Sequence, residues 1–256
     1  MFSRGMKDLK LFAEEYKEKI SLPFECYATA KTMNDEKLRL LLNAGLQKLE
    51  MGIQSGSENI LTTVYNRNIS NAQVIWASRI INNYKHEMEP PNYQIIFCNP
   101  YEKENDLMAT IRLLEKLPVP FYLHVFALCM WPSSRLFKKA SLDGLLSKEE
   151  KYIDFHAQHL ALKINNNEVY LNYILYLIRG DVTSQKMGCL HRNVLKALTK
   201  RSLVNFVNKN ANISSFVIKK LLDVEYSAIG KACSLRIQRC ITFKHKVHRV
   251  LKLWKK

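Results

Sequence analysis

The run LEMGIQSGSENIL, residues 49–61, joins an apolar, strand-like half to a helix-like half through small and polar residues. Two further runs of this kind follow it along the chain, IIFCNPYE at residues 95–102 and VFALCMWP at residues 125–132. Each run is apolar, ends in small or polar residues and precedes a helical pattern. Successive β/α units of a barrel present a ligand site at one rim in this way. The three runs therefore predict an enzyme-like α/β scaffold.

Strand-like runs alternate with helical periodicity over the first half of the chain. The predicted strands cover residues 22–28, 48–54, 93–98 and 121–128. Alternation of this kind favours a parallel sheet with right-handed crossovers. We therefore expect an α/β fold, namely a partial (β/α) TIM-like barrel of about four parallel strands.

After residue 132 the pattern indicates helices only. These predicted helices cover about residues 134–140, 147–165, 169–178, 191–208, 214–228 and 231–255. We place a soft domain boundary near Gly144. The sequence thus predicts a partial barrel over residues 1–144 and an all-helical extension over residues 145–256.

The positive charge of the chain is confined to its last part. The formal net charge is +16, with 39 Lys and Arg against 23 Asp and Glu. Counted by position, residues 1–185 carry 22 basic and 21 acidic side chains, whereas residues 186–256 carry 17 basic and 2 acidic ones. The extension is therefore strongly basic after residue 186, and the predicted barrel is nearly neutral.

Six scattered cysteines favour a reduced compartment. Several of them lie in or beside apolar runs, where a thiol packs as a small hydrophobic group. The longest strongly apolar stretch, residues 169–178, contains Asn172 and is too short to span a bilayer. No signal-peptide pattern opens the sequence, and we expect a cytoplasmic protein.

Ligands of a parallel α/β sheet lie beyond the carboxyl ends of its strands. At the end of the second predicted strand, Gln54 and Ser55 offer amide and hydroxyl groups, and Gly56 lets the backbone approach a ligand closely. Ser57 and the helix start after it provide N–H donors suited to a carboxylate. Arg67, just after that helix, is placed to clamp the same carboxylate with two hydrogen bonds.

These segments resemble the second half of the core of radical S-adenosylmethionine (SAM) enzymes, especially the subgroup that often carries a cobalamin-binding domain. The run LQKLEMGIQSGSE at residues 46–58, with YNR at residues 65–67, is similar to the fourth strand of that family and its SAM-binding segment. The run YQIIFCNPYE at residues 93–102 resembles the fifth-strand motif, and FYLHVFALCMWP at residues 121–132 resembles the sixth strand. The resemblance covers about residues 5–150.

The resemblance implies a set of cofactor contacts. It implies that Gln54, Ser55 and Arg67 contact SAM, with Arg67 on the carboxylate and Ser55 near the ribose or carboxylate. By the same comparison, the strand backbone around Ile96 and Cys98 supports the adenine. Cys98 departs from the family pattern, as does Tyr101, because glycines are common at both positions. Family members also bind a [4Fe–4S] cluster, and some of the subgroup bind cobalamin.

The family holds its cluster through three cysteines spaced C-x3-C-x2-C, and this sequence has no such spacing. Cys233 and Cys240 lie seven residues apart and do not replace it. We therefore expect the chain to match the distal part of a radical SAM enzyme, with an unknown substrate, and to be inactive in SAM cleavage by itself. No catalytic residue and no metal ligand is assigned. A natural truncation, a fragment and a mis-started gene all stay open.

Several other side chains allow both a structural and a functional interpretation. Glu102 either binds a ligand or starts a helix with a charge that suits the helix dipole. His124 either faces the barrel interior or is a satisfied core or outward-facing imidazole. Cys98 and Cys129 are either packing thiols or redox and metal groups.

A non-catalytic binding or interaction protein is the alternative function. The basic residues of 235–254 flank an apolar stripe, which suits an anionic membrane surface, nucleic-acid phosphates or docking on the domain. Open strand edges favour self-association, or pairing with a missing N-terminal half that another chain supplies.

Overall fold

A computed structural model describes residues 2–128, 131, 134–145 and 166–209. The chain divides into two compact units, Met1–Thr199 and Lys200–Lys256. The described part of the second unit is one helix, α9 (Arg201–Lys209). The predicted helices at 147–165, 214–228 and 231–255 and the basic stripe lie outside the described residues, as do three cysteines: Cys129, Cys233 and Cys240.

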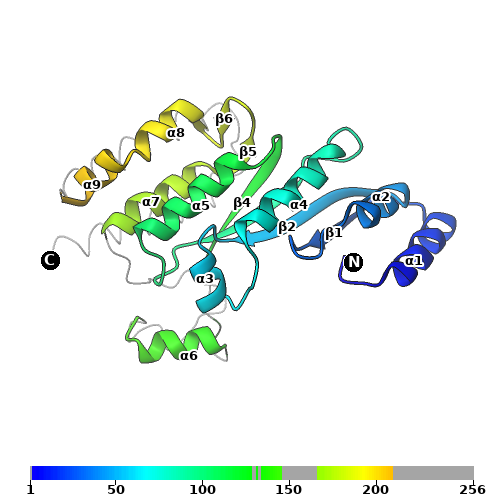
Figure 1. The fold of residues 1–256 in the computed structure, drawn as a ribbon, viewed down its shortest axis with the longest axis horizontal. Helices are drawn as coiled ribbons and strands as arrows, with labels where there is room; N and C mark the ends of the chain where they lie inside the picture. The colour runs from blue at the N-terminus through cyan, green and yellow to red at the C-terminus, as the bar shows by residue number, and fades with distance from the viewer. Residues whose placement is uncertain (1, 129–130, 132–133, 146–165, 210–256) are drawn as a thin grey trace, which may run out of the picture. The chain divides into compact units, whose positions relative to one another are not determined.

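Helices and strands alternate along the first unit, and Figure 1 follows them from blue to yellow. From the N-terminus to the fourth strand they are α1 (Met6–Lys19), β1 (Phe24–Ala28), α2 (Asp35–Asn43), β2 (Leu46–Gln54), α3 (Glu58–Thr63), α4 (Asn71–Asn83), β3 (Asn92–Phe97), α5 (Glu104–Lys116) and β4 (Phe121–Ala127). After them come α6 (Arg135–Leu142), α7 (Asn166–Leu177), β5 (Gly180–Val182), β6 (Lys186–Met187), β7 (Leu190–His191) and α8 (Arg192–Leu198).

The first four strands lie side by side in chain order and run parallel. This confirms the α/β fold class and the four predicted strands, whose bounds differ from the prediction by a few residues at most. The sheet as described is open, with β1 at one end and β7 at the other. Closure into a partial barrel and the boundary near Gly144 stay predictions.

The prediction of an all-helical extension is wrong for residues 180–191. Strand β5 pairs antiparallel with β4, and β6 and β7 continue the same sheet. Two glycines make these short strands possible, because Gly180 and Gly188 adopt φ values of +97° and +55°. A Cβ at Gly188 would meet the Leu177 carbonyl oxygen at 2.4 Å, so the chain turns there in close contact with the end of α7.

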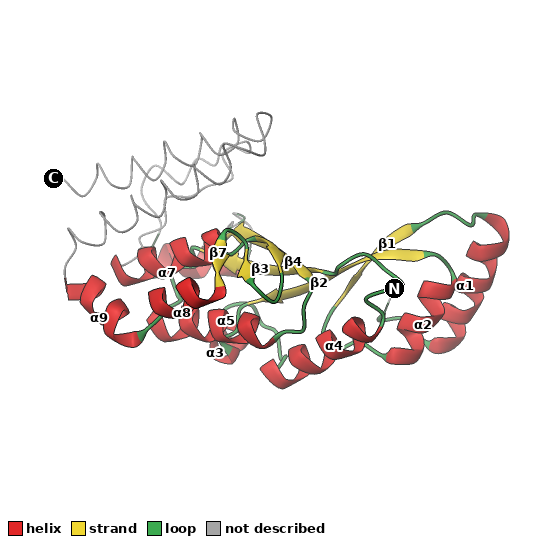
Figure 2. Ribbon diagram, turned by 90° about the horizontal axis from the view of Figure 1, so that it is seen from above, coloured by secondary structure: helices red, strands yellow, loops and turns green. Residues whose placement is uncertain are grey.

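The two faces of the sheet differ in character. Helices cover one face, as Figure 2 shows for α2, α4 and α5, and apolar side chains of every parallel strand are buried toward them. These side chains are Cys26, Ala28, Leu49, Met51, Ile53, Tyr93, Ile95, Phe97, Phe121 and Leu123. Successive strand residues point to opposite faces. The alternating positions, which include Tyr27, Glu50, Gln94 and His124, therefore form the other face, called here the open face.

Side-chain caps fix where the helices begin. Asn34 accepts a hydrogen bond from the Lys37 N–H at 3.1 Å and starts α2. Ser70 and Gln73 form a capping box at the start of α4. Within the described residues, no helix is both long enough and apolar enough to cross a membrane.

Gly56 permits the close packing of the end of β2 against α5. Its N–H donates to Thr110 Oγ1 at 2.7 Å, and a Cβ at this position would meet the Thr110 Cα at 2.5 Å. We expect Gly56→Ala to lower the free energy of unfolding by about 2 kcal/mol or more, because backbone rather than a flexible side chain must move. Urea denaturation measures this.

Gly5→Ala is the matched control, because a Cβ there meets only Asp8 Oδ2 at an ordinary 3.7 Å. A Gly56→Ala protein as stable as the Gly5→Ala protein would contradict the packing argument.

Candidate functional site

Gln54 and Arg67, both predicted SAM contacts, meet at the carboxyl end of β2. Arg67 Nη1 donates to Gln54 Oε1 at 2.5 Å and lies 3.5 Å from the Gly52 carbonyl oxygen. The Gln54 backbone is left-handed, with φ +64°. Its amide folds back over Gly52, where a Cβ would lie 2.4 Å from Gln54 Nε2. Arg67 is half-buried, and this burial lowers its pKa because desolvation disfavours the charged guanidinium.

Ser55, the next predicted SAM contact, belongs to a buried network instead of the open face. Its hydroxyl is fully buried, donates to Glu102 Oε1 at 2.7 Å and lies 3.2 Å from Thr110 Oγ1. The Ser57 N–H donates to Ser55 Oγ at 3.1 Å. The hydroxyl therefore links the end of β2 to the loop after β3, and contact between Ser55 and SAM stays a prediction.

Glu102 is the buried carboxyl group of this network, with 1% of its surface exposed. Burial raises its pKa to about 8, with a further contribution from the charge of Asp106, while the Ser55 hydrogen bond acts in the opposite direction. Its second oxygen, Oε2, is buried and has no hydrogen-bond partner among the described residues. The neighbouring Tyr65 hydroxyl also has a raised pKa, because of burial and the Glu102 charge.

The structure explains one departure from the family pattern. Cys98 follows β3 with φ +57°, a left-handed conformation that glycine adopts without strain. Its N–H donates to Asn172 Oδ1 at 2.7 Å, so this backbone donor is already used within the protein. Burial, and then the Glu102 charge, raises the pKa of the Cys98 thiol to about 12.

Ile96 lies on the open face and packs against Leu128 and α6. The predicted adenine contacts of Ile96 and Cys98 stay predictions.

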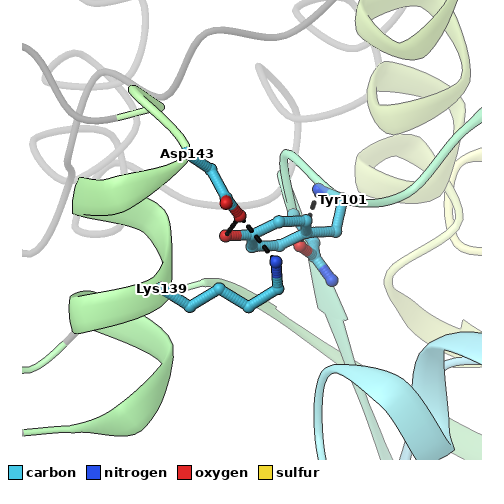
Figure 3. Close-up of polar contacts among 4 residues, drawn as sticks. Tyr101, Lys139 and Asp143 are labelled. Atoms are coloured by element: carbon cyan, nitrogen blue, oxygen red, sulfur yellow. Dashed lines mark hydrogen bonds and ion pairs between the residues drawn. The ribbon is translucent and has the colours of Figure 1, made fainter.

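Tyr101, the second residue at a usual glycine position, holds α6 in place. Its hydroxyl donates to Asp143 Oδ2 at 2.7 Å, and Lys139 Nζ donates to the same oxygen at 2.6 Å. Lys139 Nζ also lies 4.8 Å from the centre of the Tyr101 ring. Figure 3 shows both side chains reaching Tyr101 from α6 and its end. Sequence reasoning missed this contact, and the only signal was the tyrosine in place of a glycine.

His124 lies on the open face of β4, between the rings of Tyr122 and Phe126. The ring centres are 4.9 Å and 5.8 Å from that of His124, in edge-to-face geometry.

Sequence reasoning also missed Glu50 on β2, because a single carboxylate in an apolar run gives no motif. It accepts hydrogen bonds from the side-chain amides of Asn92 and Gln94.

The described cysteines do not form a cluster site. Cys26 lies in β1, Cys98 directly follows β3, and Cys189 lies between β6 and β7. Within the described ranges, no group of three or more His, Cys, Asp or Glu side chains is arranged to hold a metal ion. Burial raises the pKa of Cys26 to about 11, whereas an iron ligand must be a thiolate. The described residues therefore do not fit a [4Fe–4S] cluster.

The raised pKa of Glu102 predicts that the free energy of unfolding depends on pH. Between its ordinary pKa of 4.5 and its folded pKa of about 8, the folded chain keeps a proton that the unfolded chain has released. Stability therefore falls as the pH rises through this window, by up to a few kcal/mol. Glu102→Gln removes the titrating group, and we expect the fall between pH 5 and pH 8 to become smaller in urea denaturation. Glu14→Gln, at an exposed position of α1, should keep the wild-type fall, and equal slopes in all three proteins would refute the prediction.

Comparison with known proteins finds only distant similarity to solved structures, over about half of the chain. No protein-family model matches the chain, and no curated protein matches its sequence. Among solved structures, the radical SAM methyltransferase TsrM from Kitasatospora setae, with cobalamin and a [4Fe–4S] cluster bound, is 13% identical, with a TM-score of 0.46. That match covers 56% of this chain and 27% of TsrM.

A second structure of TsrM, with tryptophan and a SAM analogue bound, gives the same identity and TM-score over 56% of this chain and 28% of that one. Coproporphyrinogen III oxidase (HemN) from Escherichia coli, a radical SAM enzyme, is 16% identical, with a TM-score of 0.44 over 53% of this chain and 31% of HemN. The chain thus spans less than a third of the length of these proteins. Likeness at this level assigns no activity to it.

Proposed function

We propose that this chain supplies the SAM-binding wall of a radical SAM enzyme barrel, with the open face of β1–β4 turned toward the barrel interior. The observation that carries the proposal is the Arg67–Gln54 pair at the carboxyl end of β2. Ligands of parallel sheets bind beyond such strand ends. The sequence resemblance names the same two residues.

Arg67 is suited to the carboxylate of SAM. The guanidinium has five N–H donors in a planar fork, and its described hydrogen bonds use Nη1 alone. Its charge is partly desolvated, so a bound carboxylate offsets the cost that burial imposes on it. Gln54 fixes the direction of the fork. Ser55 acts through Glu102 as a positioning residue, because its hydroxyl is used inside the network.

SAM cleavage does not follow from the described residues. The family's cluster supplies the electron for that step when it is bound. Since these residues do not fit a cluster, the proposal for this chain is binding, and inactivity of the isolated chain is part of it. Cobalamin binding stays an expectation that rests on the resemblance. The resemblance does not identify a substrate.

The proposal is tested by titrating the full chain with SAM in a calorimeter. We expect saturable binding that Arg67→Gln weakens at least about tenfold, because a charge-assisted hydrogen-bond pair to the carboxylate is lost. Arg112→Gln is the control, since it removes the same charge from an exposed position of α5. Binding that is absent from the wild type, or equal in the two variants, would overturn the proposal.

A second candidate, an interaction protein, is supported by the edge of the sheet. In the described part of the chain, β1 pairs with β2 alone, so its other edge presents unpaired backbone groups. Leu22, just before β1, is 62% exposed, and Tyr27 within it is 65% exposed. Pairing of two β1 edges would cover both the backbone groups and these side chains.

Sedimentation velocity tests this candidate. We expect the wild type to form species heavier than the 29.9 kDa chain, and Leu22→Lys to shift the population toward the monomer, because a charge would be buried in the contact. Leu142→Lys, at an 88% exposed position of α6, is the control. A monomeric wild type, or the same shift in both variants, would exclude association through β1.

A further inference from the structure

Four side chains form one row across the open face. The strand register places Tyr27 beside Glu50, Glu50 beside Asn92, and Asn92 beside Tyr122. All four occupy the positions that alternate with the helix-facing residues. The row, called here the Glu50 row, therefore consists of a carboxylate and an amide between two phenol rings.

Glu50 is a buried carboxylate that has no cationic partner in the described part of the chain. It is 8% exposed and accepts hydrogen bonds from Asn92 Nδ2, at 3.2 Å, and from Gln94 Nε2. Among the described residues, no ion pair includes Glu50. A carboxylate has about four acceptor positions, and neutral amides do not cancel its charge. Buried charges in proteins are usually paired, so this one calls for a cation.

Arg67 is not that cation in the described structure. Its Nη1 is held by Gln54 and lies 3.5 Å from the carbonyl oxygen of Gly52, two residues beyond Glu50 along β2. Among the described residues, no ion pair joins Arg67 to Glu50. Gly52, on the same face, contributes no side chain. The Arg67–Gln54 pair and the Glu50 row are therefore neighbouring groups on the open face with no described contact between their side chains.

Aromatic rings flank the carboxylate. Tyr27 is 65% exposed and lies beside Glu50 in the strand register, and the charge of Glu50 raises the pKa of its hydroxyl. On the other side, Tyr122 begins an aromatic file along β4 that continues through His124 to the half-exposed Phe126. Ring faces attract cations, and ring edges and faces also pack against apolar bodies.

We propose that the Glu50 row binds an organic cation, namely an ammonium or amidinium group carried by an apolar or aromatic body. Glu50 pairs with the charged nitrogen, Tyr27 and Tyr122 flank it, and the file along β4 contacts the body. Glu50 makes no described contact with Gln54 or Arg67, and its probe is an amine rather than SAM, so the two binding measurements are independent. The failure of this proposal and the failure of the proposed function are therefore distinguishable.

Phenethylamine, which is protonated at pH 7, is the probe, and 2-phenylethanol is its neutral counterpart. Calorimetric titration of the full chain should show saturable binding of the amine and weaker binding of the alcohol. Glu50→Gln should weaken amine binding at least about tenfold, because it removes the charge and keeps the shape. Glu25→Gln is the matched control, as it removes an exposed carboxylate from the same face of β1 and should weaken amine binding much less than Glu50→Gln does.

Circular dichroism will show whether the Glu50→Gln protein folds. If it does not fold, Tyr27→Ala provides a second variant that tests the proposal. Because Tyr27 is mostly exposed, this variant should fold and bind the amine about threefold more weakly, as expected for the loss of an exposed cation–π contact. The proposal is overturned if the wild type does not bind the amine, if the alcohol binds as tightly, or if Glu25→Gln weakens binding as much as Glu50→Gln. Unchanged affinity in Tyr27→Ala would also overturn it.

Discussion

The hydrogen bond from Ser55 to Glu102 joins the carboxyl ends of two neighbouring strands, and the geometry of the site depends on it. It ties the residue after β2 to the loop after β3 at 2.7 Å, deep inside the protein. Gly56, next along the chain, fits against Thr110 of α5 only because it has no side chain. With both ends fixed, the turn that follows β2 has little freedom, and α3 brings Arg67 back to Gln54. A polar contact is strong here because it is shielded from water.

The sequence was sufficient to predict the alternating strands and helices from β1 to β4, because each of them leaves a local pattern. Short apolar runs with polar ends, separated by helical periodicity, predicted four strands in parallel order. Residues 180–191 were mispredicted because their strands are two or three residues long, too short for alternation to show. Their glycines were the available signal, and two positive φ values decide the turn there.

Within the site, sequence reasoning predicted proximity better than orientation. Gln54 and Arg67 were expected together and lie together, since both follow from the end of one strand and the helix after it. The direction of Ser55 depends on Glu102 and Thr110, which come from other parts of the chain, so it had no local signal. Glu50 was missed for the same reason, because its partners are distant in the sequence. Its partners Asn92 and Gln94 belong to a neighbouring strand, and only the register brings them to it.

The two strand ends of the site share one further property, and it links the fold to binding. Gln54 and Cys98 both adopt left-handed backbone conformations, which cost a residue with a side chain about 1 kcal/mol or more. Each is held by a contact from elsewhere, Gln54 by Arg67 and Cys98 by Asn172. The strain persists because these contacts fix both residues. The same contacts orient the amide of Gln54 and occupy the N–H of Cys98, so the proposed SAM site is preorganised, with the Gln54 amide set in place before any ligand binds.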